Sequence, residues 1–260
     1  MKLFIHTSGQ GRPLILLHGW GFQHQVWDPV AAALSQHYCV HQVDLPGYGN
    51  SDPLPAGNNS LLTQVTWLAE QLPTGIWLGW SLGGLLAQQL AVSYPDKVSA
   101  LCLVASTPCF MQAKNWSHAM PADTLANFAQ NLKTDYQATL LRFMSLQIKG
   151  SVDARVHLRK LRQDLSQSPP PSSATLENGL RLLQTSDLRA QLAHIACPVW
   201  LSLGERDTLV PVSVAQDWNR HGLTQLQSCI IDNGGHMPFL SHSGLWLEKL
   251  QVFLNDLQGA

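Results

Sequence analysis

The segment that most constrains the fold of this chain is a pentapeptide, Gly79-Trp80-Ser81-Leu82-Gly83. The apolar run 76–78 before it predicts a strand, and the run 84–91 after it is compatible with a helix. A serine between two glycines at such a junction is typical of a tight turn that holds a nucleophilic hydroxyl clear of the backbone. Because a helix N-terminus favours negative charge, the same junction suits a reaction in which an anion develops at the serine.

The hydrophobic patterns on either side of this turn predict an α/β fold. Strands are expected at 2–7, 13–17, 39–44, 100–105, 199–203 and 228–231, of which 13–17 and 39–44 are predicted to be buried, and helices at 26–35, 61–71, 212–219 and 245–257. Strands that alternate with helices in this way predict a mostly parallel sheet with helices on both faces.

The alternation stops between residues 110 and 187. Four helical patterns occupy this stretch, at 123–132, 135–147, 153–165 and 175–185, and the proline run Pro169-Pro170-Pro171 predicts a turn before the last of them. We therefore expect a core made of residues 1–109 and 188–260, with residues 110–187 inserted as a helical lid.

Composition narrows the class of protein. The 260 residues are 45% hydrophobic and only 13% charged, which is enough apolar material for one substantial core. A net charge of −1 argues against binding nucleic acid by overall electrostatics. No apolar run is long enough to span a bilayer, and the run 14–17 is too short for a signal peptide. We expect a soluble, cytoplasmic, monomeric protein with no membrane or nucleic-acid partner.

Cysteine and histidine usage predicts neither disulfides nor a metal site. The five cysteines have no C-x-x-C spacing, which favours buried, reduced thiols. The eleven histidines include no H-E-x-x-H motif. We therefore expect no metal and no cofactor.

A serine nucleophile needs a base and a carboxylate, and the sequence offers candidates for both. His236 lies in a glycine-rich loop after the strand at 228–231, and Asp207 follows the strand at 199–203. Both would reach the carboxyl edge of the sheet, where Ser81 lies. Asp232 competes for the role of the acid, but it is only four residues before His236, so Asp207 is preferred.

The loop after the strand at 13–17 predicts the remaining part of such a site. The backbone amides of Trp20 and Leu82 are candidates for an oxyanion hole. We interpret His18 as a structural histidine. Asp44 precedes the serine in the chain, so we expect it to brace the turn at 45–52 rather than to act in catalysis.

The motifs His18-Gly19-Trp20-Gly21, Asp44-Leu45-Pro46-Gly47-Tyr48-Gly49, Gly79-Trp80-Ser81-Leu82-Gly83-Gly84 and Gly234-Gly235-His236 resemble the α/β-hydrolase superfamily over nearly the whole chain. The sequence around Trp80, together with Arg142-Phe143-Met144-Ser145-Leu146-Gln147, is similar to the sequences of one family in particular. Its members are esterases that hydrolyse the methyl ester of pimeloyl-acyl carrier protein in biotin synthesis.

This resemblance implies roles for individual residues. The catalytic triad would be Ser81, Asp207 and His236, and the substrate-binding positions would be Trp20, Leu82, Phe143, Met144, Ser145, Leu146 and Gln147. Arg142, Arg155 and Arg159 match positions that hold the acyl carrier protein, whereas Ala138 stands where a further arginine is expected.

Two alternatives stay open from the sequence. A broad-specificity short-chain carboxylesterase or thioesterase would share every triad residue, and a ligand-sensing protein could keep the fold and the triad. The segment 142–162 has six basic residues and one acidic residue in a chain whose net charge is −1. This segment could be a solvated helix face or a surface for an acidic carrier protein.

Overall fold

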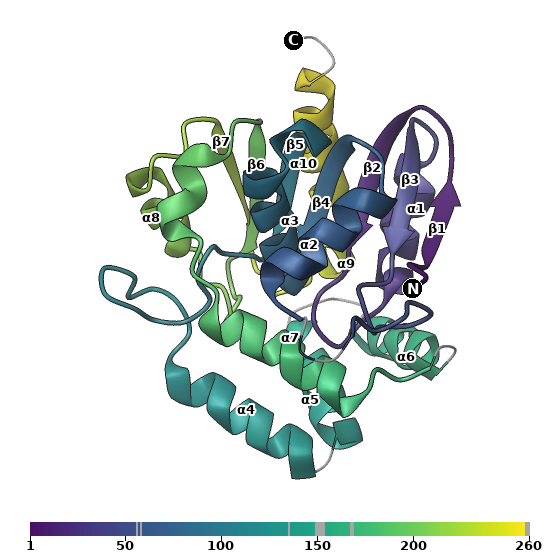
Figure 1. Cartoon of the computed structure of the whole chain (residues 1–260), viewed down its shortest axis with the longest axis vertical. Helices are drawn as coiled ribbons and strands as arrows, with labels where there is room; N and C mark the ends of the chain where they lie inside the picture. Colours follow the sequence, from purple (N-terminus) through teal and green to yellow (C-terminus); the bar gives the residue numbers. More distant parts are fainter. Residues whose placement is uncertain (56, 58, 135, 149–153, 167–168, 258–260) are drawn as a thin grey trace.

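The computed structural model describes residues 1–55, 57, 59–134, 136–148, 154–166 and 169–257 (Figure 1). Its centre is a seven-stranded sheet with the order β1-β3-β2-β4-β5-β6-β7. The strands are β1 (Ile5–Ser8), β2 (Arg12–Leu17), β3 (Tyr38–Val43), β4 (Gly75–Trp80), β5 (Val98–Val104), β6 (Val199–Gly204) and β7 (Leu226–Ile231). Only β1 runs antiparallel, against β3, and all other neighbours are parallel.

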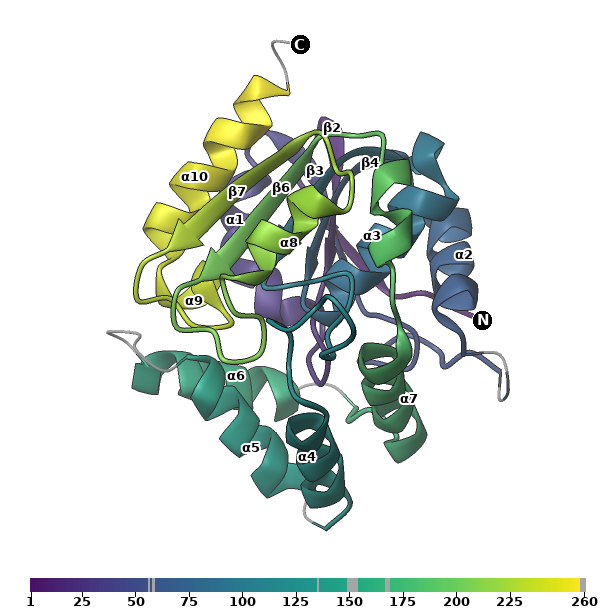
Figure 2. The ribbon, with the colours of Figure 1, turned by 90° about the vertical axis from the view of Figure 1, so that its left-hand side faces the viewer.

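The middle of the sheet is buried on both faces, as its continuous apolar strands require. Every residue of β4 and of β6 is buried. Helices α2 (Leu61–Gln71), α3 (Leu82–Ser93) and α8 (Val214–Arg220) cover one face, and α1 (Asp28–Leu34) and α10 (Ser243–Asp256) cover the other (Figure 2). The side chain of Ser60 caps α2 by accepting a hydrogen bond from the amide of Thr63.

In the described part of the chain, four α-helices lie between β5 and β6. They are α4 (Ala122–Thr134), α5 (Tyr136–Gln147), α6 (Ala154–Ser166) and α7 (Ser173–Thr185), and they gather at one end of the molecule, beyond the sheet (Figures 1 and 2). The loop after β2 holds two of them. Trp20 Nε1 donates to the carbonyl of Leu176 on α7 at 2.9 Å, and Gln23 Nε2 donates to that of Asp164 on α6 at 3.0 Å.

Local structure differs from the sequence expectation at three places. The helix expected at 26–35 is divided into a 3-10 turn, η1 (His24–Trp27), and α1, whose first turn contains Pro29. The first strand starts at Ile5, because the amides of Lys2 and Phe4 donate to the side chains of Asp52 and Ser51 instead of to a strand.

The third difference concerns short segments with little periodicity. Residues 110–120 form a loop with bridges at Met111–Met120 and Ala113–Trp116. The short helices η2 (Pro95–Lys97), η3 (Arg189–His194) and α9 (Pro238–Ser241) were not expected, because elements of a few residues leave no measurable repeat in the sequence.

Candidate active site

Ser81 lies at the junction of β4 and α3 in a backbone conformation that residues with a side chain rarely adopt. Its φ is 54° and its ψ is −114°. The flanking glycines leave no room for larger residues. A Cβ at Gly79 would collide with the carbonyl of Gly83, and one at Gly83 would lie 2.5 Å from the carbonyl oxygen of His18. The turn therefore needs its glycines, and it holds a strained serine at the end of a buried strand.

Asp207 and His236 are joined in a buried hydrogen bond. Asp207 Oδ2 lies 2.7 Å from His236 Nδ1, and the two residues are 6% and 2% exposed. The other carboxylate oxygen of Asp207 accepts from the amides of Leu209 and Val210 at 2.8 and 3.0 Å, which fixes its orientation. The indole ring of Trp80, the neighbour of Ser81, packs against the imidazole with ring centroids 5.7 Å apart.

This contact fixes the protonation of His236. A carboxylate only accepts hydrogen bonds, so Nδ1 of His236 carries the proton and Nε2 keeps a free lone pair. Nε2 is buried and has no partner among the described residues. The imidazole can therefore accept a proton at Nε2 while Asp207 stabilises the imidazolium. The competing acid, Asp232, is exposed, and no hydrogen bond joins it to His236.

Two backbone amides are available near the serine. Leu82 begins α3, and the first amides of a helix have no acceptor within it. Trp20 lies in the loop after β2, where Gly19 packs so closely on Trp80 that a Cβ would lie 2.8 Å from its ring. Neither amide donates to another backbone group in the described part of the chain. They can therefore donate to a negatively charged oxygen.

His18 and Asp44 hold the surrounding loops. The amide of Leu45 donates to His18 Nε2 at 3.0 Å, so the imidazole is neutral and its Nδ1 donates to the carbonyl of Gly19 at 2.8 Å. Burial lowers the pKa of His18 to about 4. Both ring nitrogens are occupied, so His18 has a structural role.

The carboxylate of Asp44 accepts hydrogen bonds from the same loops. Its Oδ1 accepts from the amide and from Nδ1 of His24, both at 2.8 Å, and its Oδ2 accepts from the amide of Asn50 at 2.9 Å. Burial alone would raise the pKa of Asp44, but the hydrogen bond from His24 and the nearby His18 bring it below the usual value.

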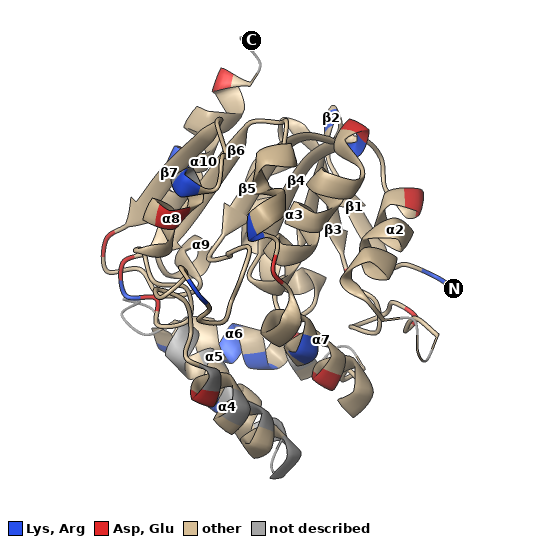
Figure 3. Cartoon of the chain, turned by 60° about the vertical axis from the view of Figure 1, so that its left-hand side comes forward, with Lys and Arg blue, Asp and Glu red and all other residues tan. Residues whose placement is uncertain are grey.

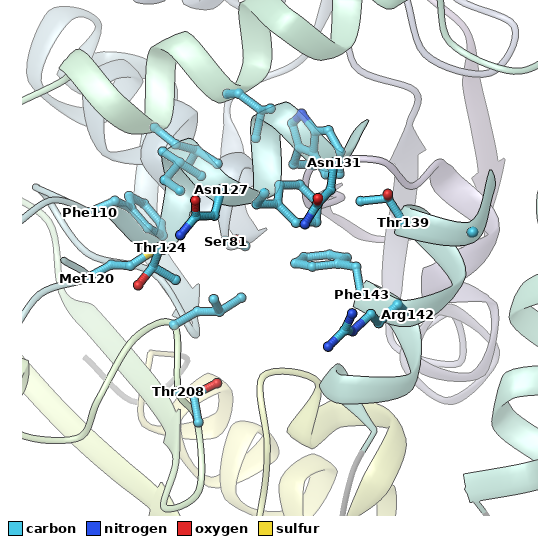
Figure 4. Close-up of a pocket in the computed structure, with 17 residues that line it drawn as sticks. Ser81, Phe110, Met120, Thr124, Asn127, Asn131, Thr139, Arg142, Phe143 and Thr208 are labelled. Carbon is cyan, nitrogen blue, oxygen red and sulfur yellow. The ribbon is translucent and has the colours of Figure 1, made fainter. Parts of the chain in front are cut away.

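A cavity of about 710 Å³ opens beside Ser81 (Figure 4). Its apolar wall includes three aromatic side chains in mutual contact. The ring of Trp20 lies 5.2 Å from that of Phe128 and 5.8 Å from that of Phe143, and these two phenyl rings are 5.2 Å apart. Asn127, Asn131, Thr139 and Arg142 supply polar groups to the same cavity. The arrangement suits an extended, largely apolar ligand with a few polar groups.

The residues predicted for the lid lie in different places. Phe143 and Arg142 of α5 border the cavity, as does Ala138. Ser145 is exposed and does not border it. The side chains of Met144, Leu146 and Gln147 lie outside the described part of the structure. Arg155 and Arg159 are exposed on α6, which contains several basic residues (Figure 3).

Other residues of the cavity wall were not predicted. Phe110, Met120, Leu180, Leu183 and Leu209 come from segments far apart in the chain, and only the tertiary fold brings them to Ser81. The positions on α4 had a usable signal: Thr124, Asn127, Phe128 and Asn131 share one helical face at spacings of three and four residues.

The described ranges contain neither a cluster of metal ligands nor a membrane-spanning helix. No group of three or more histidine, cysteine, aspartate or glutamate side chains there is arranged to hold a metal ion. None of the helices there combines the length and the apolar character needed to cross a bilayer.

The chain resembles known proteins over most of its length. Curated relatives named pimeloyl-acyl-carrier protein methyl ester esterase include one from Nitrosomonas europaea, 43% identical over 92% of this chain and 94% of the relative, and one from Vibrio cholerae, 41% identical over 97% and 98%. The solved structure of the esterase EaEST from Exiguobacterium antarcticum superposes with a TM-score of 0.87 at 22% identity, covering 97% of this chain and 95% of the other.

The sequence also matches the model of a protein family described as having the alpha/beta hydrolase fold, over residues 12–243. This match covers most of the chain, including the turn at Ser81, Asp207 and His236. It agrees with the parallel sheet and with the helices on its two faces. The chain belongs to the alpha/beta hydrolase family.

Proposed function

We propose that this protein is a serine carboxylesterase that hydrolyses the methyl ester of pimeloyl-acyl carrier protein, releasing methanol and the free acid. The observation that carries the proposal is the similarity to full-length relatives of that name, at 38–43% identity. The buried pair of Asp207 and His236 near a strained serine supports the same chemistry.

In this mechanism the side chains act in sequence. His236 takes the proton of Ser81 at Nε2, and Ser81 Oγ attacks the ester carbonyl carbon. The amides of Trp20 and Leu82 hold the oxyanion. The bond from carbon to methoxide breaks, and His236 returns the proton to the leaving oxygen, so methanol departs from an acyl-Ser81 ester. Water, deprotonated by His236, then attacks this ester, and His236 returns that proton to Ser81 Oγ as the bond from carbon to Oγ breaks and the free acid leaves.

The helices α4 to α7 supply the acyl pocket in this proposal, and residues 110–187 act as the lid. Phe143 of α5 and Phe128 of α4 line the apolar wall against Trp20. Trp20 thus presents its amide to the reaction and its ring to the acyl chain. Met144, Ser145, Leu146 and Gln147 remain substrate-binding candidates on the implied lid segment.

The carrier protein would dock on the basic side chains of the lid. Arg155 and Arg159 are exposed on α6 and form no ion pair within the described residues, whereas Lys160 of the same helix pairs with Asp164 and Asp28. Arg142 borders the cavity itself. Unpaired arginines at the end of the molecule that holds the cavity suit an acidic partner.

The direct test offers the purified protein methyl-pimeloyl-acyl carrier protein and measures methanol and the free acid. We expect stoichiometric release of both over many turnovers. A broad-specificity esterase would instead hydrolyse short p-nitrophenyl esters with a kcat/KM equal to or above that for the carrier substrate. A ligand sensor would turn over once, slowly, and keep the product bound.

A further inference from the structure

One face of α4 supplies several of the polar groups of the cavity. Asn127 and Asn131 are one helical turn apart, and both border the cavity, with Thr124 on the same face. Figure 4 shows the two carboxamides directed toward the open space in front of Ser81. A largely apolar cavity thus contains two neighbouring groups that can each donate and accept hydrogen bonds.

Neither carboxamide is used to hold the protein together. No hydrogen bond of Asn127 or Asn131 is found within the described residues. Asn178 on α7 provides a contrast, since its side-chain oxygen accepts from Arg181 at 2.6 Å. The pair on α4 is therefore free to bind a ligand.

The cavity is also larger than the acyl chain of the proposed substrate. A methyl-pimeloyl group has about eleven non-hydrogen atoms, and at roughly 30 Å³ each, the share of a water molecule in the liquid, it fills about 330 Å³. The cavity holds about 710 Å³. Roughly half of the space remains for the group to which the acyl chain is attached.

We propose that Asn127 and Asn131 bind the amide groups of the pantetheine arm through which a carrier protein holds its acyl chain. This inference rests on the proposed function and gives it a second recognition site. Acyl carriers present their cargo on such an arm, which contains two secondary amides. A carboxamide can donate to the carbonyl of an amide and accept from its N–H at once, so carboxamides suit this ligand.

The spacing of the two residues supports this assignment. Residues i and i+4 of a helix are about 6 Å apart along its axis. The two amides of the arm are separated by a β-alanine unit, which is one methylene longer than the 3.8 Å repeat of a peptide and spans about 5 Å. One turn of α4 therefore matches the separation of the two amides.

The charge of the cavity wall supports the same assignment of the pantetheine arm to this cavity. Arg142 is the one charged residue among the described residues that border the cavity. The arm joins its carrier through a phosphodiester, and a guanidinium is well suited to bind that group. In this assignment Ser81, the asparagine pair and Arg142, which all border one cavity, bind the ester, the amides and the phosphate of one extended substrate.

The test compares three substrates with the same methyl-pimeloyl ester: the carrier-bound thioester, the pantetheine thioester without carrier, and dimethyl pimelate without the arm. The variants Asn127→Leu and Asn131→Leu keep side-chain size and remove hydrogen bonding. We expect each to raise KM for the pantetheine thioester about threefold to tenfold, the effect of one lost hydrogen bond, with little change in kcat. KM for dimethyl pimelate should change by less than about twofold.

The matched control is Gln130→Leu, an exposed position of α4 that does not border the cavity. It should leave all three KM values unchanged. Equal losses on dimethyl pimelate would mean that the asparagines shape the ester pocket, and unchanged KM values on the pantetheine thioester would mean that they bind nothing there. Either result overturns this inference.

The same experiment separates this inference from the proposed function. If the parent protein released no methanol from the carrier-bound ester, the proposed function would fail. KM values of the variants and the parent for the pantetheine thioester and for dimethyl pimelate would still decide the role of the asparagines.

Discussion

The indole Nε1 of Trp80 donates a hydrogen bond to the backbone carbonyl of His236 over 2.8 Å. Trp80 directly precedes the proposed nucleophile, and His236 is the proposed base, so one bond joins the backbone segments that carry both. Both groups are buried. The bond thus connects the end of β4 with a loop 156 residues further along the chain.

Trp80→Phe tests the importance of this link for catalysis. The variant keeps an aromatic ring against Phe22 and Phe239 but leaves the carbonyl of His236 without its donor. An unsatisfied buried carbonyl costs about 1–3 kcal/mol of stability. We expect kcat to fall about threefold to tenfold with KM unchanged, because the imidazole loses part of its alignment.

Trp77→Phe is the matched control for that variant. Trp77 lies on the same strand, and its Nε1 donates to the carbonyl of Lys97 at 2.9 Å, outside the active site. It should lower the free energy of unfolding by a similar amount and leave kcat unchanged. Equal losses of kcat in both variants would mean that Trp80 acts only through stability.

A fluorophosphonate probe should label Ser81 and no other residue. Ser81→Ala should abolish labelling and lower kcat by about 10⁶-fold, the scale of removing a triad nucleophile. Mass spectrometry of the labelled peptide and steady-state kinetics check the two outcomes. Turnover near the parent rate in a sample free of contaminating esterase would contradict the mechanism.

Asp207→Asn should keep the fold and lower kcat roughly 10⁴-fold, because an amide in place of the carboxylate favours the wrong tautomer of His236. Asp232→Asn is the control, since Asp232 is exposed and lacks a bond to His236. Its kcat should stay within about threefold of the parent, in keeping with an exposed residue that is not part of the triad. A reversed order of the two effects would show that Asp232 is the acid.

Arg155→Glu combined with Arg159→Glu should raise KM for the carrier-bound ester at least about tenfold through lost charge pairing. Hydrolysis of a small neutral ester should continue near the parent rate. Added salt should weaken the parent on the carrier substrate, as screening shortens to about 8 Å or less. Lys249→Glu, at an exposed position of α10 at the far end of the molecule, is the control for net charge. Equal losses on both substrates would mean that the arginines stabilise the lid.

His18 should make the stability of the protein depend on pH. Its pKa is about 4 in the folded chain against 6.5 in the unfolded chain. As pH falls below 6.5, His18 binds a proton in the unfolded state but not in the folded state. The contribution of His18 to stability is therefore full above pH 6.5 and declines toward pH 4. The loss is on the order of 3 kcal/mol over this window.

Urea unfolding between pH 7.5 and pH 4.5 measures this loss. His18→Gln should flatten the dependence on pH, whatever its effect on stability at pH 7.5. The exposed His37→Gln should keep the slope of the parent. An unchanged slope in His18→Gln would show that other groups cause the decline.

The parts of the fold that follow from local periodicity could be predicted from sequence. The helix expected at 61–71 has the bounds of α2, and the strands before and after Ser81 lie where the apolar runs predicted them. The order of strands depends on pairings between distant segments. The antiparallel position of β1 beside β3 therefore had no local signal.

The candidate site divides in the same way. Ser81, Asp207 and His236 each follow a strand, so their common edge could be predicted from a parallel sheet. The aromatic contact of Trp20 with Phe128 and Phe143 could not, because it depends on how two lid helices pack against a loop of the core. The bond from Trp80 to His236 is likewise a product of tertiary structure.

The position of β6 beside β5 determines when the chain can become active during its synthesis. Residues 105–198 are made between these two adjacent strands, so a growing chain can form the turn at Ser81 long before Asp207 and His236 leave the ribosome. Until then the edge of β5 has no partner and can pair with other chains. When β6 and β7 add to that edge, β5 becomes an interior strand and the nascent protein gains its proposed base in the same step.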